Sequence, residues 1–247
     1  MTPFRFEPRG RIDSSNDEAR RLALNGAGHG TLVTAVEQTK GRGRRGRLWH
    51  SPPGNLHCSL LLDPGPDPAL APQLAFVSAL ALQSALAELA AGVEFRVKWP
   101  NDILCRGAKI AGMLLEQAGP LIILGVGVNI AAHPDGALYP ATSLRQVGSG
   151  AQACDLLAGF CDAFAPRYDA WRAGGFAALR GDWLAVASGL GEAVTARLAD
   201  GRVLQGRFAG LATDGALILA SRDGPLQSIL AADIFFSGMG WADAPGD

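Results

Sequence analysis

Residues 40–49 form the segment that most limits how this chain can fold. Its first eight residues hold five cations and three glycines, although the whole 247-residue chain has a net charge of only −1. Like charges repel one another, and glycine loses the most backbone freedom on ordering. Ordering costs roughly 1–2 kcal/mol per residue, and a charge-assisted hydrogen bond contributes roughly 1.5–3 kcal/mol. We therefore predict a loop that closes over an anion and is disordered when empty. A solvated basic loop or a nonspecific RNA-binding patch would show the same local composition.

Composition narrows the class of protein. With 48% hydrophobic residues, the chain can bury one sizeable core and a small second domain. A pI near 6.4 does not favour a duplex-binding protein, which is usually basic over a whole face. The N-terminus lacks the pattern of a signal peptide. The longest apolar stretch, residues 70–91, is interrupted by polar side chains and is typical of a buried helix rather than a membrane span.

Cysteine and histidine usage predicts a cytoplasmic protein without a structural metal. The four cysteines form no C-x-x-C pair and lie in apolar contexts, as expected of reduced core thiols. The four histidines are scattered without ligand spacing. These residues are Cys58, Cys105, Cys154, Cys161, His29, His50, His57 and His133.

Hydrophobic periodicity predicts a mixed order of helices and strands up to about residue 188. The expected helices are residues 17–24, 70–90, 151–173 and 176–187, the last two with Trp171 and Trp183 as packing anchors. The expected strands are residues 31–38, 55–62, 95–99, 109–116 and 121–130. The basic segment then lies in a long connection between two paired strands.

The pattern of hydrophobic residues changes after residues 188–191. Short alternating runs at 194–198, 203–208, 216–219 and 227–230 are separated by Asp-Gly turns, including one at 222–225. This pattern predicts a compact all-β barrel of about fifty residues. The chain is thus divided into domains 1–188 and 189–247.

Several polar strings interrupt these elements. Asp-Ser-Ser-Asn at 13–16 precedes a helix and could be an N-cap and nothing more. Lys-Trp-Pro-Asn-Asp at 98–102 breaks an apolar strand and could be an ordinary turn. Gly112 lies within a strand, which often marks close approach of a ligand. Gly125 and Gly127 lack the third glycine and following helix of a dinucleotide site.

Taken together, these strings resemble biotin–protein ligases in both order and spacing. The resemblance rests on Asp-Ser-Ser-Asn, Gln-x-x-Gly-Arg-Gly-Arg-Arg-Gly-Arg-x-Trp, Lys-Trp-Pro-Asn-Asp, Lys-Ile-Ala-Gly and Gly-Val-Gly-Val-Asn, and it covers essentially the whole chain. It implies an α+β fold: a mixed-sheet catalytic domain related to class II aminoacyl-tRNA synthetases, followed by a small C-terminal SH3-like β-barrel.

The resemblance also implies an activity. Family members activate biotin with MgATP to biotinyl-5′-AMP and transfer biotin to one lysine of a biotin carboxyl carrier domain, such as that of acetyl-CoA carboxylase. Some carry an N-terminal winged helix that represses transcription. Since the first motif here begins at Asp13, we expect no DNA-binding domain. We expect no membrane association, and pairing through a sheet edge could give a homodimer.

Site residues are carried over from the family motifs by position. Lys109, Arg44 and Arg42 match catalytic positions, with Lys109 beside the biotin carboxylate and Arg44 retaining the intermediate. The biotin-binding positions are Ser14, Ser15, Asn16, Gln38, Gly41, Arg42, Lys109 and Gly112. The ATP and adenylate positions are Arg44, Arg45, Arg47, Trp49, Asn101, Asp102 and Asn129. Asp102 also matches a position near Mg²⁺, and Ser15 stands where the family more often has threonine.

Three alternatives differ in class. A lipoate or octanoyl ligase shares the fold and the adenylate chemistry, but its motifs lack the arginine-rich glycine loop. An RNA-binding module would use the basic loop, yet Trp49 is the only aromatic residue that adjoins it, and such modules pair cations with stacking aromatics. An inactive relative would bind biotin only.

Overall fold

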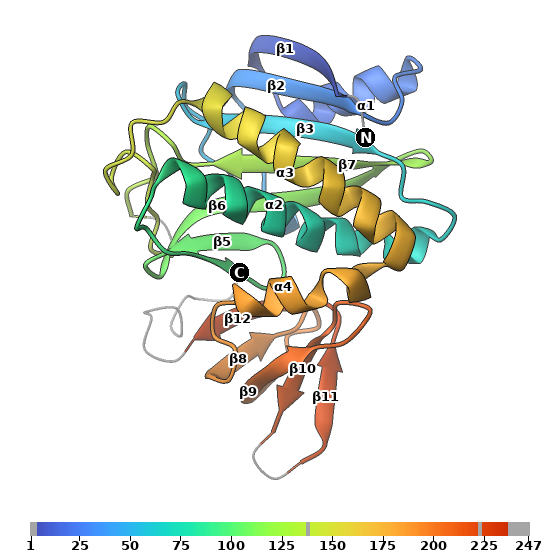
Figure 1. Ribbon diagram of the computed structural model, residues 1–247, viewed down its shortest axis with the longest axis vertical. Helices are drawn as coiled ribbons and strands as arrows, with labels where there is room; N and C mark the ends of the chain where they lie inside the picture. Colours follow the sequence, from blue (N-terminus) through green and yellow to red (C-terminus); the bar gives the residue numbers. More distant parts are fainter. Residues whose placement is uncertain (1–3, 137–138, 222–223, 237–247) are drawn as a thin grey trace.

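The large sheet of the computed structural model contains seven strands in the order β1-β2-β3-β7-β6-β5-β4 (Figure 1). The structure describes residues 4–136, 139–221 and 224–236. Only β1 and β2 pair in parallel; the other neighbours are antiparallel. This mixed sheet confirms the predicted α+β class. Its strands are β1 (Arg5–Ile12), β2 (Thr31–Gln38), β3 (Leu56–Leu62), β4 (Phe95–Lys98), β5 (Asp102–Cys105), β6 (Ala108–Ala118) and β7 (Leu121–Val128).

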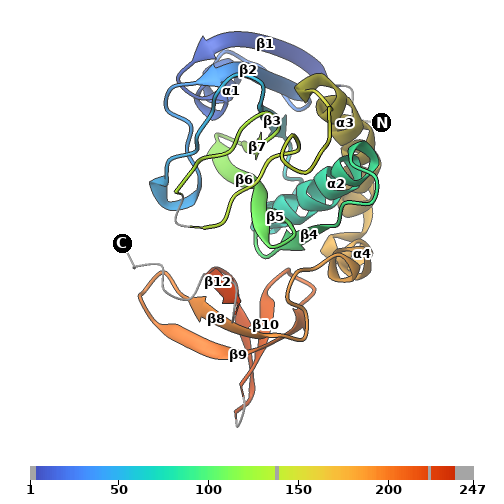
Figure 2. The same cartoon turned by 90° about the vertical axis from the view of Figure 1, so that its left-hand side faces the viewer.

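Helices cover both faces of this sheet. Figure 2 shows α1 on one side and α2 and α3 on the other. α2 is almost wholly apolar because it lies between the sheet and α3. Residues Pro68–Leu89 are long and apolar enough to span a membrane, and 72% of their most apolar window is buried inside the protein. The helices are α1 (Ser15–Leu24), α2 (Leu74–Leu89), α3 (Ala153–Gly174) and α4 (Arg180–Ala185), with 3-10 turns at Arg44–Gly46, Pro68–Gln73 and Phe176–Ala178.

A second sheet of five antiparallel strands follows α4, in the order β11-β10-β9-β8-β12. Four of its strands were predicted, and β12 was not. The predicted turn at 222–225 lies partly outside the described residues, and closure into an SH3-like barrel stays a prediction. The strands are β8 (Ala193–Arg197), β9 (Val203–Leu211), β10 (Leu217–Ala220), β11 (Leu226–Ile229) and β12 (Asp233–Phe236).

Aromatic side chains join the small sheet to the large domain. Trp99 Nε1 donates to the Gly215 carbonyl oxygen at 3.0 Å. Phe76 lies against Trp183, with ring centroids 5.7 Å apart, and a Cβ at Gly215 would collide with the Phe76 ring. Trp171 and Trp183 are both buried, which confirms their predicted packing role. The small sheet is thereby held beside the large one.

The basic segment contains a 3-10 turn at Arg44–Gly46, and carboxylates from distant elements pair with three of its arginines. Its disorder in the absence of an anion stays a prediction. One prediction from the sequence is wrong. Cys154 is exposed at the start of α3, whereas the other three cysteines are buried core thiols. An apolar sequence context near a helix start does not determine which face a side chain takes.

Candidate active site

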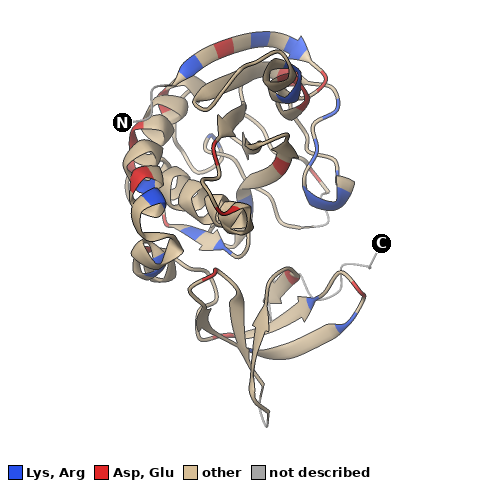
Figure 3. Cartoon of the chain, turned by 90° about the vertical axis from the view of Figure 1, so that its right-hand side faces the viewer, with Lys and Arg blue, Asp and Glu red and all other residues tan. Residues whose placement is uncertain are grey.

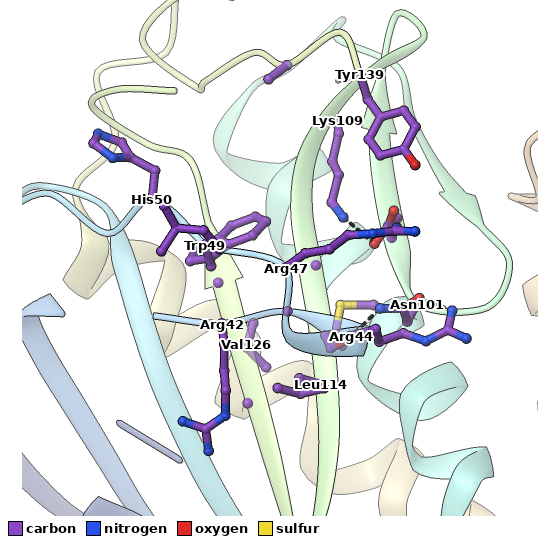
Figure 4. Close-up of a pocket in the computed structure, with 18 of the residues that line it drawn as sticks. Arg42, Arg44, Arg47, Trp49, His50, Asn101, Lys109, Leu114, Val126 and Tyr139 are labelled. Atoms are coloured by element: carbon purple, nitrogen blue, oxygen red, sulfur yellow. Dashed lines mark hydrogen bonds and ion pairs between the residues drawn. The ribbon is translucent and has the colours of Figure 1, made fainter. Parts of the chain in front are cut away.

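A cavity of about 600 Å³ opens on the face of the large sheet that carries α1. Its walls come from the start of α1, the basic segment, the β4–β5 hairpin, β6, β7, the loop after β7, and β12 of the small sheet (Figure 4). Distant parts of the chain therefore meet around one space.

One end of the cavity carries uncharged polar groups. Ser14 caps α1, and the Ser15 backbone N–H donates to Gln38 Oε1 at 2.7 Å. The Gln38 amide in turn donates to Ser51 Oγ at 2.9 Å. Ser59 Oγ, buried in β3, lies 2.8 Å from Ser15 Oγ. This network fixes the side chains at the helix start, where a neutral ligand with several donors and acceptors could bind.

Glycines form the floor beneath these groups. A Cβ at Gly125 would collide with the Asn16 side chain, and one at Gly127 would lie 2.5 Å from Trp49 Nε1. Gly112, paired with Gly127 across β6 and β7, leaves room for Lys109. The G-x-G spacing in β7 is thus explained by close packing of Asn16 and Trp49 on the sheet. No dinucleotide motif is needed.

Carboxylates hold Arg42 at one side of the basic segment. Its guanidinium donates to both Asp17 oxygens at 2.7 Å and to both Glu116 oxygens at 2.9 and 3.1 Å. The hydrogen bonds to Asp17 and Glu116 raise the pKa of Arg42. Burial favours a higher pKa for Glu116, but hydrogen bonds from Arg42 and Asn16 outweigh it and hold that pKa below its usual value. Arg42 therefore orders the loop and points away from Lys109 and Arg44 (Figure 4).

The other side of the basic segment is held by the small sheet. Asp233, at the start of β12, accepts from Arg45 at 2.7 Å and from Arg47 at 2.6 Å through the same oxygen, Oδ2. Only Arg47 of these two arginines lines the cavity. Figure 3 shows the concentration of Lys and Arg on this segment and along β1. The small sheet thus contributes both a wall and a counterion.

Arg44 lies between these two anchors and has a different environment. It is half-buried, and its Nη1 donates to Asn101 Oδ1 at 3.1 Å. Within the part of the chain that the structure describes, Arg44 forms no ion pair. Burial lowers the pKa of its guanidinium, although arginine stays charged at neutral pH. A desolvated cation with a neutral partner is suited to bind an anion.

A second cation, Lys109, lies above the floor. Its Nζ is 2.7 Å from Asp102 Oδ1 and 5.6 Å from the centroid of the Trp49 ring. Since Lys109 neutralises Asp102, that carboxylate is poorly suited to hold Mg²⁺ directly. The described residues contain no cluster of three or more His, Cys, Asp or Glu side chains that could bind a metal.

Most of the residues assigned from the family motifs line this one cavity. They are Ser14, Ser15, Asn16, Gln38, Arg42, Arg44, Arg47, Trp49, Asn101, Asp102, Lys109, Gly112 and Asn129. Arg45 and Gly41 do not line it. Arg45 points to Asp233, and a Cβ at Gly41 would collide with Ser51 and lie 2.6 Å from the Trp49 carbonyl oxygen. Gly41 is thus needed for packing of the loop.

The sequence interpretation missed several residues of the site. Lys98, Tyr139 and Asp233 line the cavity, and Ser59 supports it from below. A serine within the apolar strand β3 was a usable signal for Ser59. Asp233 lies 186 residues from Arg47, and no local pattern connects them.

Comparisons with known proteins agree with this geometry. The description "Biotin/lipoate A/B protein ligase family" matches residues 10–130, and "Biotin protein ligase C terminal domain" matches residues 189–237. A biotin–[acetyl-CoA-carboxylase] ligase of Paracoccus denitrificans is 43% identical, over 92% of this chain and 99% of its own. A bifunctional ligase/repressor of Bacillus spizizenii is 36% identical, over 90% of this chain and 71% of its own.

A solved structure extends the similarity to three dimensions. The biotin protein ligase of Aquifex aeolicus in complex with biotin and ATP superposes with a TM-score of 0.84 at 28% identity, covering 94% of this chain and 99% of that one. Sequence, fold and cavity residues lead to the same assignment: the chain belongs to the biotin protein ligase family.

Proposed function

We propose that this protein activates biotin with MgATP to biotinyl-5′-AMP, releases pyrophosphate, and transfers biotin to a lysine of a biotin carboxyl carrier domain. The observation that carries this proposal is the division of the cavity into an uncharged polar end and a cationic end. A ureido ring suits the network of Ser15, Asn16 and Gln38, which offers neutral donors and acceptors. The carboxylate and phosphate suit Lys109 and Arg44.

The cationic end also accounts for the chemistry. A biotin carboxylate and an α-phosphate repel each other, so bringing them together requires positive charge in a partly dry site. Lys109 and Arg44 supply it from the sheet and from the loop. In the second step, the acceptor lysine gives a proton to solvent, and its neutral nitrogen attacks the carbonyl carbon. The bond from that carbon to the phosphate oxygen breaks, and AMP leaves with the electron pair. In the first step, Mg²⁺ bound to ATP would offset charge on the leaving pyrophosphate.

Further features of the proposal concern organisation and partners. We propose two domains, residues 1–188 and 189–247, supported by the separate sheet from β8 to β12. The acceptor is a carrier domain of acetyl-CoA carboxylase or a related carboxylase, and the protein acts in the cytoplasm, where its buried thiols stay reduced.

A homodimer stays a prediction. The edge strand β1 exposes Arg5 and Arg11, and edge charges disfavour sheet pairing.

Incubation with biotin, MgATP and a carrier domain, read by intact mass, tests the proposal. We expect a mass gain of one biotin that is lost when ATP is omitted. A gain only with lipoate on a lipoyl domain would assign the protein to lipoate ligases. A salt-sensitive RNA shift without any gain would favour an RNA-binding module instead.

The glycine floor gives a prediction about biotin affinity. Gly125→Ala should displace the Asn16 side chain and break its hydrogen bonds to Ser59 and Glu116. Losing about 1.4 kcal/mol of buried hydrogen bonding corresponds to a roughly tenfold rise in the biotin Kd. Isothermal titration calorimetry with biotin alone measures this effect.

A matched glycine serves as its control. Gly10, in β1, has no atom within 4 Å of a Cβ built there, so Gly10→Ala should leave the biotin Kd unchanged. Equal affinities of the Gly125→Ala variant and the unmodified protein would contradict the role of Asn16 at the floor.

A further inference from the structure

Lysine is rare in this chain and concentrated at the cavity. Of the 22 basic residues only three are lysines, at positions 40, 98 and 109. Lys98 and Lys109 line the cavity, whereas Lys40 is exposed outside it. The lysine ammonium is a compact charge, and burial readily lowers the pKa of a lysine, whereas an arginine stays charged. Lys109 has a role in the proposed reaction, and Lys98 so far has none.

Lys98 is buried where the two sheets meet. It ends β4, pairs with Asp102 across the β4–β5 hairpin, and is only 6% exposed. Its Nζ lies 5.8 Å from the centroid of the Tyr139 ring and 5.7 Å from that of Phe236 in β12. The Lys98 ammonium thus lies beside the small sheet, whereas the Lys109 ammonium lies beside Trp49 of the basic segment.

The charges on this wall leave an excess of positive charge. Arg42 is neutralised by Asp17 and Glu116 and can be set aside. Among the other described lining residues, four cations face two carboxylates. The cations are Arg44, Arg47, Lys98 and Lys109, and the carboxylates are Asp102 and Asp233. With Lys98 protonated, these side chains carry two more positive than negative charges, and pyrophosphate leaving the nucleotide is an anion that can balance them.

We propose that Lys98 is a second catalytic lysine, which contacts the pyrophosphate leaving group while Lys109 contacts the biotin carboxylate. The inference rests on the proposed function. A carboxylate oxygen of biotin attacks the α-phosphorus, and the bond from that phosphorus to the bridging oxygen breaks. Pyrophosphate leaves with the electron pair, and the charge that builds on it is stabilised by the Lys98 ammonium.

The protonation of Lys98 is consistent with this role. Burial lowers its pKa to about 7, while the Asp102 carboxylate opposes the shift. Lys109 and Arg47 also lower the pKa, and Asp233 raises it. Near neutral pH the free site therefore holds Lys98 partly uncharged, and an incoming polyphosphate favours the ammonium. Nucleotide binding should take up a proton, which is measurable as a dependence of the binding enthalpy on buffer ionisation.

The test separates the two half-reactions. Lys98→Met should lower the rate of pyrophosphate release from biotin and MgATP by about 10²-fold, in line with the loss of one preorganised charge. Transfer from supplied biotinyl-5′-AMP to a carrier domain involves no pyrophosphate, so it should change by less than about threefold. Lys98→Arg should recover part of the first rate, because it restores the charge but not the shape.

Lys40→Met is the matched control and should leave both rates unchanged. Equal losses in the two half-reactions of Lys98→Met would show a structural role, and an unchanged rate of pyrophosphate release would overturn the inference. If the unmodified protein released no pyrophosphate with biotin, the proposed function itself would fail, independently of Lys98.

Burial of this charge also has a consequence for stability. The unfolded chain keeps the ordinary Lys98 pKa of 10.5, so between pH 7 and that value it binds a proton that the folded protein lacks. Stability attributable to Lys98 therefore rises with pH across this window. Lys98→Met should raise the Tm of the ligand-free protein at pH 7 and reduce its increase toward pH 9. A lower Tm would indicate that Lys98 holds the two sheets together.

Discussion

Replacing Lys109 with methionine should lower the rate of pyrophosphate release by roughly 10²–10³-fold, the usual cost of losing one preorganised charge at a reacting centre. Its Nζ lies beside Asp102 and over the glycine floor at Gly112, between the polar and cationic ends of the cavity. In the proposed reaction, the carboxylate of biotin bound at the polar end would meet the phosphate here. Transfer from supplied biotinyl-5′-AMP should also fall, since in the proposed reaction Lys109 contacts the carbonyl side of the mixed anhydride in both steps.

The Lys98→Met variant provides a comparison for this prediction, because the two lysines should differ in the half-reactions that they affect. Lys109→Met should impair both half-reactions, whereas Lys98→Met should impair only the first. Both rates are measured on the same preparations, pyrophosphate by a coupled assay and biotin transfer by intact mass. Asp102→Asn keeps the side-chain volume but removes the counterion at 2.7 Å, so it should weaken adenylation less than Lys109→Met. Near-normal pyrophosphate release by Lys109→Met would remove Lys109 from the catalytic set.

Periodicity predicted the fold well wherever an element buries a continuous face. β2 occupies residues Thr31–Gln38, as the alternation of β-branched residues indicated. β1 was not predicted from the sequence, because its exposed arginines and internal proline hide the alternation of polar and apolar residues. It is an edge strand that is held mainly by parallel pairing with β2. β10 and β11 are as short as β12 and were predicted, whereas β12 was not. Its strand character depends on pairing with β8, which local sequence does not encode.

The candidate site was predictable where its residues lie in short strings. The string from Lys98 to Asp102 indicated Asn101 and Asp102 as site residues, but not Lys98. The counterions of the basic segment were not predictable, because Asp17, Glu116 and Asp233 come from three separate elements. These carboxylates offset part of the positive charge of the segment, an effect that a balance of entropy and charge within the segment alone does not include.

This anchoring leads to the second large effect, at Arg44. Arg42 is fixed by Asp17 and Glu116, and Arg47 by Asp233, so Arg44→Gly should leave the basic segment in place. Adenylation, driven mainly by Lys109, should therefore be largely retained. The charge-assisted hydrogen bonds that Arg44 would form to the adenylate phosphate should be lost, which at roughly 1.5–3 kcal/mol corresponds to about 10–100-fold faster release. Free biotinyl-5′-AMP should accumulate in solution.

Chromatography of the reaction mixture, with labelled ATP and biotin and no carrier domain, measures the free intermediate directly. Arg45→Gly is the matched control: Arg45 belongs to the same segment but is exposed, pairs with Asp233 and does not line the cavity. It should release no more intermediate than the unmodified protein. Equal release by the two variants would mean that loop order, rather than the Arg44 charge, retains the adenylate. Unchanged release by Arg44→Gly would place retention elsewhere, with Arg47 as the next cation on the wall. Carboxylates of the protein anchor this loop at both sides, so the loop can lose the Arg44 charge and still close. Mutation can therefore separate the exclusion of water from the retention of the intermediate.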